Sequence, residues 1–299
     1  MVINSDKLVI APKKILYLYR ELMPYNIEVL KELVAKNSQL IVVHDDVKKQ
    51  TPYNPPEIKN ATICRRSEFT YVKLLSMAFE FNPDLIYISD RTVSLYNKVA
   101  MALRKKKQIP VISGNDTPWR GGKQWFNVLT SVFRHKRYYS HMLVAGMRQF
   151  EYAKKLGFKN DRILFPLNSA NLNVFLSLNI SLDRFKGRNI LFVGRFHRVK
   201  GLDLLIKAWS KVENKNGAKL YLVGHGELLN SINLPEDIIV IAFSNQEELL
   251  RIAERCRTLI LPSRYEPWGL VIHEFAAAGM PIIATNVCGA VPHLLINQF

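Results

Sequence analysis

Short runs of β-branched and aliphatic residues recur along this chain, and the intervals between them leave room for a helix. Such runs are typical of strands buried on both faces of a parallel sheet. Helical patterns lie between them, for example at residues 27–35 and 69–81, and Pro83 prevents the second helix from continuing. The alternation predicts two doubly wound α/β units. The expected strands are residues 15–19, 40–43, 85–88, 111–112 and 142–145, then 189–193, 220–223, 238–241, 259–261 and 282–284.

A polar stretch at residues 168–188, with four asparagines, separates the two series of strands. A chain of 299 residues is also long enough for two domains. We therefore predict an N-terminal domain at residues 1–178, a linker at 179–188 and a C-terminal domain at 189–299. The cleft between two such domains is the usual place for a ligand.

The charge of the chain predicts an anionic partner. Forty-two Lys and Arg against 25 Asp and Glu leave a net charge of +17, and most of the excess lies within residues 1–150. Three cysteines lie far apart, without a C-x-x-C pair, which favours a reducing, cytoplasmic compartment. No window approaches the roughly 18 continuous apolar residues of a membrane-spanning helix. We expect a protein that is cytoplasmic or peripheral on the inner face of a membrane.

Two cations follow the first strand of the second series. Val193 leads into Gly194-Arg195, and Lys200-Gly201 comes just before a helix with an apolar face. Ligands of open parallel sheets bind at the carboxyl ends of the strands, where a guanidinium and an ammonium are able to reach one diphosphate. A solvated basic loop explains the same spacing.

Glycines and carboxylates follow two further strands of this series. Gly224-His225-Gly226 ends one strand, and the glycines permit either close approach to a ligand or a plain turn. Glu266 precedes a helix that starts near Gly269, whose free N–H groups would form a seat for an anion. Glu274 lies eight positions after Glu266. Two carboxylates at this spacing suit the hydroxyls of one elongated ligand, although either alone suits a charged surface.

These segments together resemble glycosyltransferase family 4, group 1 glycosyltransferases whose GT-B fold has two facing Rossmann-like domains. The resemblance covers about residues 189–290. It is carried by V-G-R-x(4)-K-G at residues 193–201, L-V-G-x-G at 222–226, and the E-x(7)-E signature from Glu266 to Glu274.

The resemblance implies a retaining transfer of sugar from a nucleoside-diphosphate sugar to an acceptor hydroxyl, in the synthesis of cell-surface polysaccharide, lipopolysaccharide or glycolipid. It implies catalytic roles for Arg195 and Lys200 at the diphosphate and for Glu266 at the donor sugar. The nucleotide would lie against six further positions, with the ribose at the last of them. These positions are Gly194, Gly224, Gly226, Gly269, Leu270 and Glu274.

The first series of strands resembles the family more loosely. After the strand at residues 111–112, the loop that begins at Asn115 matches an acceptor-side loop, and Asp116 and Trp119 are its candidate site residues. Asn115 stands where many members carry a histidine, so that role is not transferred. Members also continue for several tens of residues beyond the point matched here, so we expect a C-terminally short second domain.

The partners follow from the same reasoning. We expect a nucleotide sugar as donor substrate, a saccharide or lipid-linked acceptor, and no metal or other cofactor, because no Asp-x-Asp occurs in the chain. In residues 123–139, one side of a helix with cations at both ends would carry mainly apolar side chains, namely Trp125, Leu129, Val132 and Phe133. This pattern fits a helix on an anionic membrane surface, or a buried amphipathic helix with a solvated end.

Three other functions remain open from the sequence. The net charge and the aromatic residues between cations suit a basic nucleic-acid-binding protein, although no nucleic-acid module is evident and no nucleic-acid partner is expected. Glu266 and Glu274 suit the acid and base of a glycoside hydrolase, but Arg195 and Lys200 would then be unexplained. The third is a truncated glycosyltransferase without activity.

Overall fold

The structure, a computed structural model, describes residues 12–46, 54–176, 187–231, 234–242 and 246–295. The chain divides into two compact units. Unit 1 comprises residues 1–144 and 148–167, and unit 2 comprises residues 145–147 and 168–299. Each unit is an α/β domain built on its own parallel sheet.

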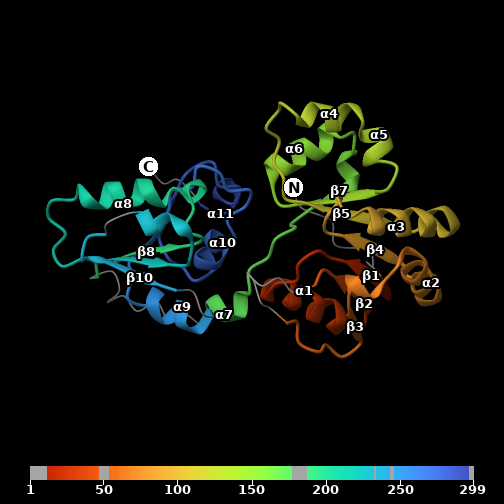
Figure 1. Cartoon of the computed structure of the whole chain (residues 1–299), viewed down its shortest axis with the longest axis horizontal. Helices are drawn as coiled ribbons and strands as arrows, with labels where there is room; N and C mark the ends of the chain where they lie inside the picture. The colour runs from red at the N-terminus through yellow and green to blue at the C-terminus, as the bar shows by residue number, and fades with distance from the viewer. Residues whose placement is uncertain (1–11, 47–53, 177–186, 232–233, 243–245, 296–299) are drawn as a thin grey trace, which may run out of the picture. The chain divides into compact units, whose positions relative to one another are not determined.

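Unit 1 contains a seven-stranded parallel sheet in the order β3-β2-β1-β4-β5-β6-β7 (Figure 1). Its strands are β1 (Lys14–Leu18), β2 (Gln39–His44), β3 (Ala61–Arg65), β4 (Leu85–Ile88), β5 (Val111–Asn115), β6 (His141–Val144) and β7 (Ile163–Leu164). Its helices are α1 (Pro24–Ala35), α2 (Tyr71–Phe81), α3 (Ser94–Lys107), α4 (Gln124–Leu129), α5 (Ser131–Arg134) and α6 (Met147–Lys155). The first residue of α6, Met147, is assigned to unit 2.

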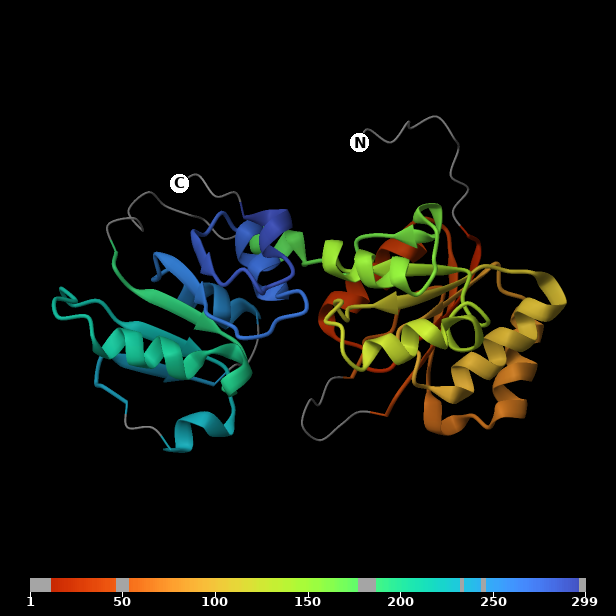
Figure 2. The same ribbon diagram turned by 90° about the horizontal axis from the view of Figure 1, so that it is seen from above.

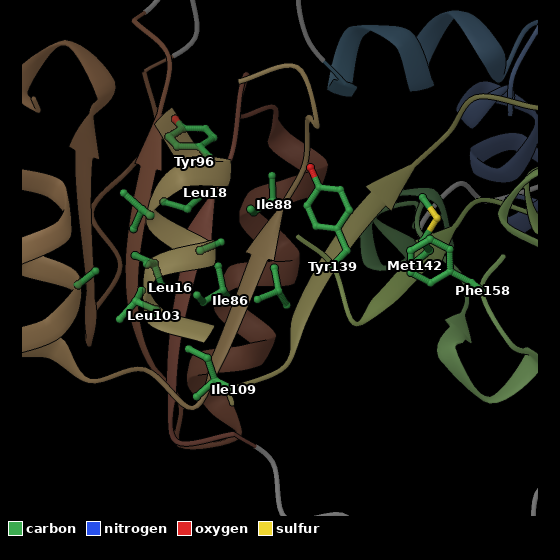
Figure 3. Packing of buried hydrophobic residues seen from close by; sticks show 14 of the residues in the cluster. Leu16, Leu18, Ile86, Ile88, Tyr96, Leu103, Ile109, Tyr139, Met142 and Phe158 are labelled. Carbon is green, nitrogen blue, oxygen red and sulfur yellow. The ribbon is translucent and has the colours of Figure 1, made fainter. Parts of the chain in front are cut away.

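Both faces of this sheet are buried, because its strands carry apolar side chains at successive positions. Leu16 and Leu18 of β1 pack on one face with Tyr96 and Leu103 of α3 (Figure 3). The alternate positions of β1 pack on the opposite face with Ile27 of α1. Continuous apolar runs therefore predicted β1, β2, β4, β5 and β6 correctly.

Unit 2 contains a five-stranded parallel sheet in the order β10-β9-β8-β11-β12. In Figure 1, α8 lies on one face of this sheet and α9 on the other, and Figure 2 shows α8 against the sheet from above. The strands are β8 (Ile190–Val193), β9 (Leu220–Val223), β10 (Ile238–Ile241), β11 (Thr258–Leu261) and β12 (Ile282–Ala284). The helices are α7 (Leu172–Leu176), α8 (Leu202–Ser210), α9 (Gln246–Ala253), α10 (Leu270–Ala277) and α11 (Val291–Leu294).

The strand orders create one switch point in each unit. In unit 2 the chain runs from β8 outward through β9 and β10, and then crosses to β11 on the other side of β8. In unit 1 the corresponding switch lies between β1 and β4. Loops diverge at the carboxyl ends of such neighbouring strands, which is where open α/β sheets bind ligands. The residues that follow β8 and β11 are therefore the first to examine.

The predicted strands match the sheets, with two additions in unit 1, β3 and β7. The unit boundary differs from the predicted one. Residues 168–176 belong to unit 2 because Phe175 of α7 is fully buried in its core against Phe275 of α10. Most of the predicted linker, residues 179–186, lies outside the described residues. None of the described helices has the length and apolar character needed to cross a membrane.

Candidate donor site

The loop after β8 carries the two predicted cations. Gly194 donates its N–H to the carbonyl of Val223, which continues the pairing of β8 with β9. Arg195 is exposed, and its guanidinium has no partner among the residues that the structure describes. Lys200 ends the 3-10 helix η4 (Arg198–Lys200), and only 18% of its side chain is exposed. One cation is thus open to solvent and the other is held within the site.

The glycine turn after β9 packs directly on this loop. Phe196 donates its N–H to the carbonyl of His225 over 2.7 Å, and Leu228 donates back to the Phe196 carbonyl over 3.2 Å. A Cβ atom on Gly224 would collide with the carbonyl of Gly194. The glycines at 224 and 226 therefore allow two loops to lie in contact at the end of the sheet.

The loop after β11 is joined to the loop after β8 by several polar contacts. The Arg264 N–H donates to the carbonyl of Val199 over 2.9 Å. The Arg264 guanidinium contacts both carboxylate oxygens of Asp203, at 2.6 and 2.8 Å, and lowers the pKa of that carboxyl. Gly201 lies beneath the carbonyl of Pro262, where any Cβ atom would collide. These contacts hold the two loops at a fixed spacing across the switch point.

Lys200 and Glu266 meet as an ion pair at this junction. The Lys200 Nζ donates to Oε2 of Glu266, and only 10% of the Glu266 side chain is exposed. The backbone of Glu266 is fixed as well, because its carbonyl accepts a hydrogen bond from Gly289 over 3.1 Å. Two residues 66 positions apart are thus in direct contact. Because both side chains keep some exposure to solvent, the two members of this ion pair are able to exchange partners with a charged or hydroxylated ligand.

Glu274 lies on α10, just beyond this ion pair in sequence. Gly269 precedes the helix with a φ of 92°, and Leu270 is its first residue. Burial raises the pKa of Glu274 from 4.5 to about 7. Among the described residues, none donates a hydrogen bond to this carboxylate. A partly buried carboxyl that lacks a donor is suited to receive one from a ligand hydroxyl.

The two acceptor-side candidates of unit 1, Asp116 and Trp119, differ from each other in their surroundings. Asp116 is exposed in the loop after β5. Trp119 is half-buried, with its ring 5.2 Å from Trp125 and 5.6 Å from Tyr152, so packing accounts for its position. Asn115 is buried, and its amide oxygen accepts the N–H of Thr117 over 3.3 Å. Asn115 therefore shapes the turn that presents Asp116.

Sequence reasoning missed a charged cluster at the switch point of unit 1. Arg20 follows β1 and contacts Asp90, after β4, at 2.6 Å, and Asp45, after β2, at 3.5 Å. Arg66 contacts the other oxygen of Asp45 at 2.5 Å. Each of these residues comes directly after a strand or one residue beyond it, a position that could have identified them.

The described residues contain no group of three or more His, Cys, Asp or Glu side chains arranged to hold a metal ion. The expectation of a reaction without a metal stays a prediction.

Comparison with known families agrees with the geometry of unit 2. Residues 180–299 match the profile of the family described as "Glycosyl transferases group 1". This segment contains the loops after β8, β9 and β11 that converge at the switch point. Residues 180–299 are therefore similar to the group 1 glycosyltransferases. The segment that matches this family thus coincides with the part of the chain where the sequence resemblance is most specific.

Two curated relatives support the assignment over part of their length. A glycosyltransferase of Methanocaldococcus jannaschii is 32% identical over 107 residues, 33% of this chain and 27% of the relative. Mannosylfructose-phosphate synthase of Agrobacterium fabrum is 27% identical over 175 residues, 53% of this chain and 35% of the relative. The matches therefore span about a third or less of these relatives.

A solved structure extends the likeness in fold to both units of the chain. HepE of Anabaena, in complex with UDP and glucose, matches with a TM-score of 0.68 and 17% sequence identity. The match covers 96% of this chain and 83% of HepE. At this identity it shows the fold, which is the GT-B class with two Rossmann-like domains, as the sequence predicted.

Proposed function

We propose that this chain is a retaining glycosyltransferase of family 4 that moves a sugar from a nucleoside-diphosphate sugar to an acceptor hydroxyl. The observation that carries the proposal is the convergence of Lys200, Glu266 and the α10 N-terminus at the switch point of unit 2. A cation beside a carboxylate and a helix N-terminus suits a ligand with both phosphates and hydroxyls.

The reaction breaks the bond between the anomeric carbon and the diphosphate, and forms a bond from that carbon to the acceptor oxygen. The bonding electrons leave on the diphosphate, and the proton of the acceptor hydroxyl passes to an oxygen of the departing diphosphate or to solvent. Arg195, Lys200 and the first N–H groups of α10 stabilise the charge that develops on the diphosphate, and one such donor is worth about 3 kcal/mol in other enzymes. This role is possible for Lys200 because the diphosphate replaces or shares its contact with Glu266.

The two glutamates bind different hydroxyl groups of the donor. Glu266 holds the hydroxyls of the sugar, and Glu274 holds those of the ribose. Gly224 and Gly226 let the loops after β8 and β9 pack together, and the nucleotide lies against the backbone of this junction, which includes Gly194. HepE was solved with UDP and glucose, which makes a UDP-sugar the first donor to test.

The acceptor and the cellular setting are part of the same proposal. Unit 1 receives a saccharide or lipid-linked acceptor, with Asp116 on the acceptor side, and the product enters cell-surface polysaccharide, lipopolysaccharide or glycolipid. The enzyme works in the cytoplasm, peripheral on the inner face of the membrane. The support for this setting is the excess of Lys and Arg within residues 1–150.

A thermal-shift screen with UDP-, GDP- and ADP-sugars, followed by product analysis, tests the donor. We expect one nucleotide series to raise the Tm of the whole chain by several degrees, because a ligand stabilises the state that it binds. Glu274→Ala and Lys200→Ala should abolish this shift. Glu254→Ala and Lys207→Ala change the same residue types at exposed positions of unit 2 and should retain it. Equal shifts for Glu274→Ala and Glu254→Ala would overturn the proposal.

A further inference from the structure

Five large apolar side chains of unit 1 lie exposed within nine residues. They project from α4 and α5, which the single predicted helix of residues 123–139 becomes in the structure. Because these side chains are exposed, one of the two interpretations of residues 123–139, a buried amphipathic helix, is excluded. The side chains, called here the α4–α5 face, are Trp125 (52% exposed), Phe126 (62%), Leu129 (78%), Val132 (60%) and Phe133 (71%).

The opposite side of the two helices is anchored to the core of unit 1. The Ser131 Oγ donates to the carbonyl of Leu156 over 2.5 Å, and the Asn127 amide donates to the hydroxyl of Tyr152 over 3.1 Å. His135 is buried, and Val128 packs against the main hydrophobic cluster. Polar and apolar contacts on the inner side thus hold the α4–α5 face outward, beside α6 (Figure 1).

Cations border the α4–α5 face directly. The Arg134 guanidinium lies 5.7 Å from the ring centre of Phe126, and the Lys155 ammonium lies 5.7 Å from that of Trp125. Residues 91–150 contain twelve Lys and Arg but only one carboxylate, that of Asp116. The apolar side chains therefore lie in a region of one strong charge sign.

A basic cavity begins where α5 ends. It has a volume of about 390 Å³, and its lining includes Arg104, Lys136, Lys159 and Arg162, with one carboxylate, Asp161. Arg104 joins the end of α3 to this region, because its guanidinium donates to the carbonyl of Lys136 over 3.5 Å. The cavity is large enough for a phosphate group, and four cations line it.

We propose that the α4–α5 face docks unit 1 on an anionic lipid bilayer. The five apolar side chains enter the boundary between headgroups and acyl chains, and the surrounding cations bind the lipid phosphates, with the basic cavity receiving a headgroup. The inference does not depend on the transfer reaction, because none of these residues belongs to the donor site.

Charge and side-chain type favour a bilayer over the other occupants. A second copy of the chain would bring the same excess of cations against this region, and like charges repel. A single-stranded nucleic acid stacks its bases on aromatic rings, which leaves the exposed Leu129 and Val132 without a role. An anionic bilayer matches both the apolar side chains and the cations.

Vesicle cosedimentation of the full chain tests the proposal with a matched pair of variants. Val132→Glu places a charge on the α4–α5 face, and Val72→Glu does the same on α2, where Val72 is 73% exposed. We expect Val132→Glu to weaken partition onto phosphatidylglycerol-containing vesicles about tenfold, because a carboxylate opposes both burial and anionic lipid. Val72→Glu should bind as the unchanged chain does. Lys136→Glu should weaken binding similarly, and Lys207→Glu, in unit 2, should not.

Three outcomes would overturn docking on a bilayer. One is equal partition of the Val132→Glu and Val72→Glu variants, and another is absence of binding to anionic vesicles at low salt. The third is concentration-dependent self-association that Val132→Glu abolishes while vesicle binding persists, which would identify the face as an interface between copies. Circular dichroism of each variant checks that it folds. A nucleotide-sugar thermal shift retained by Val132→Glu separates this test from that of the donor site.

Discussion

Glu274 carries a carboxylate at a partly buried position, and this combination makes the stability of unit 2 depend on pH. Its pKa is raised by burial from 4.5 to about 7. Below pH 4.5 the group is protonated in the folded and the unfolded chain, so its full contribution to stability is present. As the pH rises toward 7, the unfolded chain releases this proton first, and stability falls by about 3 kcal/mol in total.

We therefore predict that Glu274→Gln raises the free energy of unfolding above pH 7 by about 3 kcal/mol and leaves it nearly unchanged at pH 4.5. Urea unfolding at the two pH values measures the difference, with the exposed Glu254→Gln as control. The same variant should bind nucleotide sugar more weakly, because an amide replaces the ionised acceptor. A gain in stability of equal size at both pH values would contradict the shifted pKa.

At the scale of single residues, the sequence predicted which side chains gather in unit 2 but not how they pair. The positions of Lys200 and Glu266 after parallel strands placed them at one edge of the sheet. Their direct ion pair depends on how the intervening loops pack, and so does the contact of Arg264 with Asp203. Such contacts between residues more than sixty positions apart leave no periodic signal in the sequence.

At the scale of loops and helices, the two loops of the donor site meet at Gly201. Its φ is 70°, and a Cβ atom would collide with the carbonyl of Pro262. Gly217 has a similar φ of 74°, but a Cβ atom there would meet nothing within 4 Å. The two glycines thus separate the cost of the backbone conformation from the cost of the collision.

We predict that Gly217→Ala lowers the free energy of unfolding by about 1 kcal/mol, the cost of a left-handed residue. Gly201→Ala should lower it by about 1–3 kcal/mol more, because the Pro262 loop must move. This loop carries Glu266, so Gly201→Ala should also weaken nucleotide-sugar binding. Urea unfolding and isothermal titration measure the two effects. Equal destabilisation by both variants would show that the Pro262 loop moves aside with no loss of free energy.

The strands that the sequence missed are explained by their place in the sheet. β3 and β7 are the two edge strands of unit 1, and β7 has only two residues. β3 has no fully buried residue and includes Arg65, so the continuous apolar run of a central strand is absent. The central strands, buried on both faces, were all predicted. The fold class could be predicted because strands that are buried on both faces carry continuous apolar runs.

For the whole molecule, the proposed function assigns to Arg195 and Lys200 the balancing of the diphosphate charge, a task that a metal ion performs in glycosyltransferases of another fold. Arg195 lies exposed after β8, and Lys200 lies beside Glu266. In the proposed reaction, the fold holds Lys200 and the α10 N-terminus in place before the donor binds, and the exposed Arg195 joins them at the diphosphate. We therefore expect these groups, and not a divalent ion, to balance the charge of the diphosphate.

We accordingly predict that EDTA leaves the rate of sugar transfer unchanged, and that added Mg²⁺ or Mn²⁺ raises it less than twofold. Product formation from the donor that the thermal-shift screen identifies is the measurement. Arg195→Ala should lower kcat about 10²-fold or more, as loss of one preorganised charge donor does elsewhere, and Mg²⁺ should not restore it. Loss of transfer in EDTA with recovery in Mg²⁺ would contradict the assignment of this role to the two cations.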